Sequence, residues 1–93
     1  MREIEIFYLK GCPYCENAKR AVAELFREDP AYKALTLRWI EENEETELAD
    51  SRDYYRVPSV FYKGDKLYEC SPLHSYGTIK AHLKAAFDGA LSA

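Results

Sequence analysis

Cys12-Pro13-Tyr14-Cys15 follows an apolar run at residues 4–9 and begins a helical pattern. Pro13 suits the first turn of a helix, where a missing N–H group costs nothing. Two cysteines three residues apart at a helix start place both sulfurs on one turn, near the positive end of the helix dipole. A thiol held there ionises more readily than a free thiol, and the thiolate is the form that attacks disulfides. The motif therefore predicts thiol–disulfide exchange.

The segments around this motif predict an α/β domain. Residues 4–9 place apolar side chains on both faces, which is typical of a central strand covered on both sides. Ala18, Val22 and Leu25 then recur at helical spacing, and Pro30 marks the end of that helix. The remaining expected elements are a strand at residues 34–40, a short acidic helix at 44–52, a strand at 57–62, a turn at 63–66, a strand at 67–70 and a final helix at 75–87.

These elements give the order β-α-β-α-β-β-α in a single domain, residues 1–93. The first two strands are expected to be parallel and joined by a right-handed crossover. The last two strands are expected to form an antiparallel hairpin, because Gly64 and Asp65 supply turn chemistry between them.

The composition predicts one folded domain and argues against nucleic-acid and membrane partners. A chain of 93 residues with 47% hydrophobic residues is expected to fold around one core. Its formal net charge of −3 argues against a nucleic-acid partner. No apolar run approaches the ~20 residues needed to span a bilayer, so no membrane partner is expected. The acidic stretch at residues 41–47 is expected to be a solvated loop and helix start.

The cysteines and the N-terminus favour a reducing compartment. Residues 1–5 alternate polar and apolar side chains and do not resemble a signal peptide, so a cytoplasmic location is expected. Two of the three cysteines lie close together and Cys70 is alone. This spacing is a redox or metal pattern rather than a disulfide scaffold.

Three features in order make the chain similar to the glutaredoxin family of the thioredoxin-like superfamily. They are the first strand, the Cys-Pro-Tyr-Cys motif at the start of the next helix, and Val57-Pro58 before the hairpin; Ala18-Lys19 also resembles the family pattern. The resemblance covers essentially the whole chain. It implies a thioredoxin-like α/β fold, with a four-stranded mixed sheet and helices on both faces.

The resemblance also implies roles for the motif residues. Cys12 would be the nucleophile and Cys15 the resolving thiol, which agrees with Cys12 lying at the helix mouth and Cys15 one turn further in. Val57-Pro58 would carry a cis peptide bond, a minority conformation that usually has a function. Its backbone would then pair with a substrate like an added strand.

The chain departs from the family where glutathione is usually held. Glutaredoxins usually carry Thr-Val-Pro, whereas this chain has Arg56 before Val57-Pro58. The family's Gly-Gly pair aligns with Tyr68-Glu69, which put bulk and negative charge at those positions.

The acidic pair that follows in the family aligns with Ser71-Pro72. Arg56 and Lys10 can offset the charge of Glu69 by binding a substrate carboxylate. Glutathione is therefore one expected co-substrate, and a flavoprotein of the thioredoxin-reductase kind is the alternative electron donor.

For Cys70, His74 and His82, a simple structural role is expected ahead of redox or metal chemistry. Cys70 is foremost a small buried hydrophobe, next a former of mixed disulfides, and last a third redox thiol. His74 and His82 are eight residues apart, which does not fit a zinc site with Cys12 and Cys15, so no metal is expected.

The sequence thus predicts a cytoplasmic, monomeric dithiol oxidoreductase without a tightly bound cofactor. Its substrate would be a disulfide-bearing protein or a glutathione mixed disulfide. A non-catalytic metal or iron–sulfur carrier using the same two cysteines is the alternative from a different class. Beyond Cys12 and Cys15, the candidate substrate-binding or glutathione-binding residues are Lys10, Tyr14, Arg56, Val57, Pro58, Glu69, Cys70 and Ser71.

Overall fold

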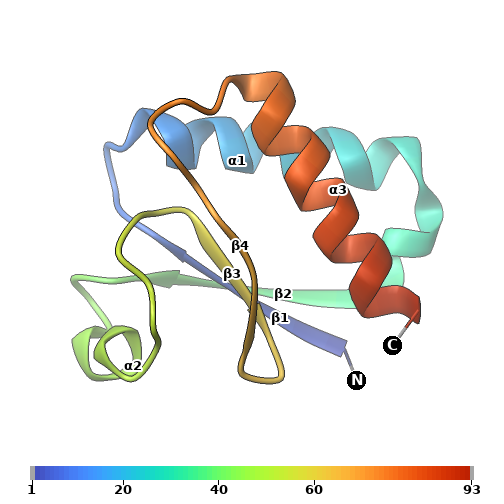
Figure 1. Ribbon diagram of the computed structural model, residues 1–93. Helices are drawn as coiled ribbons and strands as arrows, with labels where there is room; N and C mark the ends of the chain where they lie inside the picture. The colour runs from blue at the N-terminus through green and yellow to red at the C-terminus, as the bar shows by residue number, and fades with distance from the viewer. Residues whose placement is uncertain (1, 93) are drawn as a thin grey trace.

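The computed structural model describes residues 2–92 as one sheet with helices packed on it (Figure 1). In chain order the elements are β1 (Arg2–Tyr8), α1 (Pro13–Glu28), the 3₁₀ helix η1 (Pro30–Ala34), β2 (Leu35–Glu41), α2 (Thr46–Asp50), β3 (Ser59–Tyr62), β4 (Asp65–Glu69) and α3 (Tyr76–Ser92).

The sheet is mixed and four-stranded, in the order β2-β1-β3-β4. β1 pairs with β2 in parallel and with β3 in antiparallel orientation, and β3 pairs with β4 in antiparallel orientation. The prediction that residues 4–9 contribute a central strand is confirmed, because Ile6 lies between Trp39 of β2 and Val60 of β3.

Alternation along β1 sends its side chains into two separate apolar clusters, one on each face of the sheet. The larger cluster lies between the sheet and the helices α1 and α3, which run over the same face (Figure 1). The smaller cluster lies on the other face, against α2. Members of the larger cluster include Ile4, Ile6, Leu25, Val60, Ile79, Leu83 and Phe87, and the smaller one holds Phe7, Ile40, Ala49 and Phe61.

α1 ends at Glu28, just before Pro30, as expected. Pro30–Ala34 then forms η1, which was not anticipated, and the Asp29 side chain accepts a hydrogen bond from the Ala31 N–H group (3.0 Å). This cap satisfies a donor that the turn leaves open. η1 also buries Tyr32, whose ring lies 5.6 Å from that of Phe87.

Two expected boundaries were wrong in the C-terminal half. β4 begins at Asp65, before the expected residue 67, because Lys63 and Gly64 both adopt positive φ and close a tight turn between the strands. α3 continues to Ser92 rather than ending at residue 87, since Ala90 adds one more buried side chain to its inner face.

Among residues 2–92, no helix is both long and apolar enough to cross a membrane.

Candidate active site

Cys12 and Cys15 lie at the N-terminus of α1 in different surroundings. Cys12 is the N-cap residue and is partly exposed, and its carbonyl accepts the Glu16 N–H group (3.0 Å). Cys15 is fully buried, and burial raises the pKa of its thiol to about 12. The two thiols lie close enough to interact. Solvent therefore reaches Cys12, while the buried Cys15 stays protonated.

The turn before Cys12 holds its backbone in place. Gly11 has a φ of 83°, a conformation that other residues rarely adopt. The Cys12 N–H group donates to the Leu9 carbonyl (3.2 Å), and the Lys10 N–H group donates to the Glu41 carboxylate (2.9 Å). The strand end, the turn and the helix start thus form one connected unit.

Glu41 corrects the interpretation of the acidic stretch as wholly solvated. Its side chain is buried at the end of β2 and also accepts the Asn43 N–H group (2.6 Å). The hydrogen bond from the Lys10 backbone is the main cause that lowers the pKa of Glu41, against the effect of burial.

Lys10 does not direct its charge at the cysteines. Its ammonium group pairs with Glu44, and this hydrogen bond raises the pKa of Lys10. The side chain is otherwise exposed to solvent. In the structure Lys10 is therefore a solvated lysine paired with a carboxylate of the same chain.

The Val57-Pro58 bond is cis, and the segment around it is held by hydrogen bonds on both sides. The Pro58 carbonyl accepts the Cys70 N–H group (3.0 Å), and the Arg56 carbonyl accepts the Ser59 hydroxyl. Among residues 2–92, the N–H and C=O groups of Val57 have no hydrogen-bond partner. The Val57 side chain packs against the smaller apolar cluster. Its backbone N–H and C=O groups stay open.

Tyr68 and Glu69, the residues at the aligned Gly-Gly positions, both have partners within the fold. Tyr68 is buried in the larger apolar cluster. The Glu69 carboxylate pairs with Lys66 (2.7 Å) and accepts the N–H groups of Tyr55 and Arg56 (2.9 Å each). Its charge is therefore compensated within the fold.

Arg56 precedes the cis bond, and Tyr14 lies within the motif itself. The Arg56 side chain is exposed, and within the described part of the chain its guanidinium group has no ion-pair partner. The Tyr14 hydroxyl donates to the Pro72 carbonyl (3.0 Å), which ties the first turn of α1 to the segment after β4. Sequence reasoning missed Pro72 because a backbone acceptor carries no residue-type signal.

Cys70 is buried, and its thiol contacts the Ser71 carbonyl (3.5 Å). Burial is the main cause that raises its pKa, and the charge of Cys12 adds to the effect. Cys70 therefore lies near the motif but behaves as a small packed side chain, the first of the three roles considered. Its backbone, rather than its sulfur, reaches the Val57-Pro58 segment.

A stack of three rings supports the segment after β4 and was not anticipated. His74 lies in this segment, 5.7 Å from Tyr68 and 5.1 Å from His82 between ring centroids. Nδ1 of His74 interacts with the Tyr68 hydroxyl (2.7 Å) and accepts the Ser71 N–H group (3.3 Å). Ser71 also accepts the Leu73 N–H group through its hydroxyl. His74 is therefore a loop histidine, as expected, but it is partly buried and holds the loop in place.

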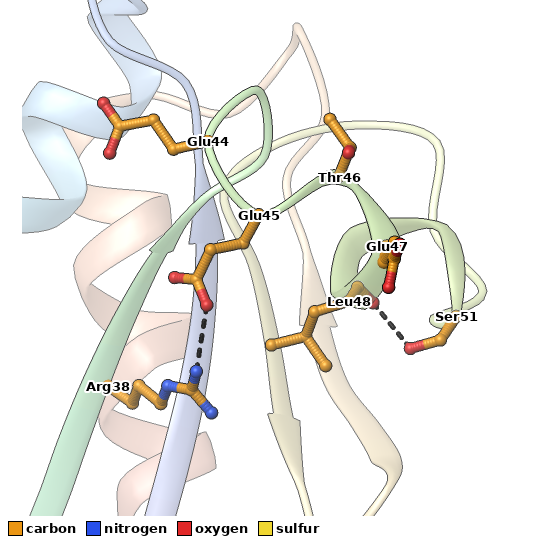
Figure 2. Close-up of a pocket in the computed structure, with 7 residues that line it drawn as sticks. All are labelled: Arg38, Glu44, Glu45, Thr46, Glu47, Leu48 and Ser51. Carbon is orange, nitrogen blue, oxygen red and sulfur yellow. Dashed lines mark hydrogen bonds and ion pairs between the residues drawn. The ribbon is translucent and has the colours of Figure 1, made fainter.

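A broad surface hollow lies elsewhere, between β2 and α2 (Figure 2). Arg38 and Glu45 pair across it (2.9 Å), and the Ser51 hydroxyl donates to the Leu48 carbonyl (2.6 Å). Glu44 points away from this pair and instead meets Lys10. Neither Cys12 nor Cys15 lines this hollow.

Comparison with solved structures identifies the fold. A structure described as that of a malarial protein superposes with a TM-score of 0.63 and 16% identity, covering 92% of this chain and 97% of the other. A mutant thioredoxin from Halobacterium salinarum gives a TM-score of 0.59 and 19% identity, covering 92% of this chain and 74% of the other. Searches against protein-family models and against curated proteins found no match. At such low identity the similarity shows the fold alone, which is thioredoxin-like.

Proposed function

We propose that this thioredoxin-like chain is a glutaredoxin-type dithiol oxidoreductase that reduces disulfides. One observation carries the proposal: a partly exposed Cys12 at the N-terminus of α1 lies against a fully buried Cys15. Cys12 at the helix start benefits from the partial positive charge of the helix dipole in its thiolate form. The pair thus combines an accessible nucleophile with a protected second thiol.

The reaction has two exchange steps. The Cys12 thiolate attacks one sulfur of the substrate disulfide, forms a mixed disulfide with it and releases the other sulfur as a thiolate. The Cys15 sulfur then attacks Sγ of Cys12, its proton passes to the departing thiolate, and the Cys12–Cys15 disulfide forms. Two electrons move from the dithiol to the substrate. Two donor thiols, or a reduced flavoprotein, return the enzyme to its dithiol form.

The segment around Val57 supports a role in substrate binding. Its unpaired N–H and C=O groups can pair with an extended substrate backbone as an added strand would. The Pro58 carbonyl ties this segment to Cys70, and the Tyr14 hydroxyl ties the motif to Pro72. A protein or peptide disulfide is therefore the proposed substrate class, together with glutathione mixed disulfides.

Arg56 supports an anionic donor or substrate. Its guanidinium group is exposed and unpaired among the described residues, whereas the carboxylate of Glu69 is compensated by Lys66. Arginine binds carboxylates through paired hydrogen bonds. Glutathione carries carboxylates, so Arg56 favours it as the electron donor, with a flavoprotein reductase as the alternative.

The first prediction concerns Cys12. Reduction of a mixed disulfide between glutathione and a peptide is measured with glutathione and glutathione reductase, and in parallel with a thioredoxin reductase. We expect turnover with at least one donor, and we expect Cys12→Ser to lower the rate to the uncatalysed background because the nucleophile is gone.

The matched control is Cys70→Ser, the same change at the third cysteine, which keeps the motif intact and should retain turnover. Full activity in the Cys12→Ser protein would refute the proposed mechanism. Turnover with the flavoprotein alone would retain the chemistry and reject glutathione as the donor.

A further inference from the structure

The loop that leads to Val57 has no regular secondary structure between residues 51 and 58, yet its backbone is bound at several points. One carboxylate oxygen of Glu69 accepts the N–H groups of both Tyr55 and Arg56 at 2.9 Å. The other oxygen binds the ammonium group of Lys66 at 2.7 Å. Lys66 also donates to the Asp53 carbonyl (3.2 Å).

The two side chains come from the same strand. Lys66 and Glu69 both belong to β4, the edge strand next to β3, and their side chains bind the loop. Two successive N–H groups that converge on one oxygen form a small anion-binding concavity. The carboxylate, with a side chain only 19% exposed, is stabilised there by two hydrogen bonds and one ion pair.

These contacts decide which backbone groups remain open. Glu69 occupies the N–H group of Arg56, Ser59 occupies its carbonyl, and Cys70 occupies the carbonyl of Pro58. Within residues 56–58, the backbone groups left without a partner belong to Val57. A loop without these bonds would sample other conformations, since irregular surface segments are the least stable parts of a fold.

We propose that Glu69 is a positioning residue that holds the loop at residues 55–58 so that the backbone of Val57 faces the substrate. The inference rests on the proposed function, because it names the part of the site that binds the substrate backbone. Glu69 touches neither cysteine and acts through the N–H groups of Tyr55 and Arg56. It binds the loop from inside the fold rather than contacting the substrate.

The test compares Glu69→Leu, Glu69→Gln and Asp88→Leu. Glutamine keeps a carbonyl oxygen for the two N–H groups, whereas leucine keeps the bulk without an acceptor. Asp88 also accepts two hydrogen bonds, from Tyr32 (2.6 Å) and Lys84 (2.8 Å), but it lies near the C-terminal end of α3, far from the N-terminus of α1 (Figure 1). Asp88→Leu therefore controls for a general loss of stability.

Two readouts are used. Amide hydrogen exchange at Tyr55 and Arg56, followed by NMR, reports the loop without requiring activity. KM and kcat for the peptide–glutathione mixed disulfide report substrate binding separately from the chemical step. For Glu69→Leu we expect exchange at both amides and KM to rise by about tenfold, the effect of losing hydrogen bonds to a charged group, with kcat changing much less.

Glu69→Gln is expected to restore the amide protection and most of the KM, and Asp88→Leu is expected to resemble the wild type in both. Equal KM and exchange in Glu69→Leu and wild type would overturn the inference, as would the same change in Asp88→Leu. If Glu69→Leu does not fold, Glu69→Ser, which is too short to reach the amides, takes its place. Absence of turnover in the wild type would refute the proposed function, while the amide comparison still decides whether Glu69 positions the loop.

Discussion

Cys12 and Cys15 are separated by less than one turn of helix, and the difference between them is one of burial. Cys12 caps α1 at the surface, whereas the pKa of Cys15 is raised to about 12 by its burial beneath the first turn. In the proposed mechanism this difference sets the order of attack, since an exposed sulfur meets a substrate that a buried one cannot reach. Glu41 holds the turn before Cys12, and Glu69 holds the segment before Val57.

A second prediction at this scale concerns Cys15. In Cys15→Ser the first exchange step remains but the second cannot occur, so Cys12 should stay linked to the substrate. With peptide–glutathione disulfide and no added thiol, we expect close to one adduct per protein molecule by intact-mass spectrometry. Cys70→Ser, which keeps both motif thiols, should accumulate no stable adduct. A Cys15→Ser protein free of adduct would contradict the assigned order of attack.

Among the elements, the packing of α1, η1 and α3 against one another holds the helix that carries the motif. Phe87 of α3 is fully buried and makes ring contacts with Phe26 (6.0 Å) and Tyr32 (5.6 Å), one from α1 and one from η1. Aromatic pairs at such distances add to the free energy of burial. The position of α1, and with it the position of Cys12, therefore depends on side chains far from the site.

Phe87→Ala is predicted to lower the free energy of unfolding by about 3–5 kcal/mol, the usual cost of deleting a buried phenylalanine ring. Urea denaturation followed by circular dichroism measures the change. Leu73→Ala removes a large apolar side chain that is 93% exposed, so it should change the free energy of unfolding by less than about 0.5 kcal/mol. Similar losses in the two variants would contradict the packing described for α3.

For the molecule as a whole, carboxylates connect elements that are distant in sequence. Glu41 binds the turn before Cys12, Glu69 binds the loop before Val57, and Asp88 joins α3 to η1. Burial raises the pKa of Glu69, but Lys66 and the two backbone N–H groups more than offset it, so its pKa lies below its usual value. Hydrogen bonds likewise lower the pKa values of Glu41 and Asp88.

These lowered pKa values predict loss of stability in acid. A carboxyl group with a depressed pKa in the folded state contributes its full stability above the pKa of the unfolded chain, about 4.3 for glutamate, and loses it as the pH falls through the folded value. The urea midpoint should therefore be flat near neutral pH and fall progressively below about pH 4.3. Glu41→Gln, which cannot ionise, should be less stable at neutral pH and show a shallower fall. An acid-insensitive wild type would contradict this account.

Features that depend on local spacing were readable from the amino-acid sequence. Alternation in residues 4–9 predicted a central strand, helical spacing after Pro13 predicted α1, and the mixed four-stranded sheet with helices was found as expected. Such patterns are readable because side-chain direction repeats every two residues in a strand and every 3.6 in a helix. The spacing of Cys12 and Cys15 by itself likewise predicted one accessible and one shielded thiol.

The roles of Glu41, Glu69 and His74 emerged only from the folded arrangement. Glu41 meets Lys10 from 31 positions away, and Glu69 meets Tyr55 and Arg56 from 14 and 13 positions away. A carboxylate looks the same in a sequence whether it faces water or accepts backbone N–H groups. Tertiary structure decides which distant backbone groups come within reach of such a carboxylate. Buried polar groups must find their hydrogen bonds among the groups that the fold brings to them.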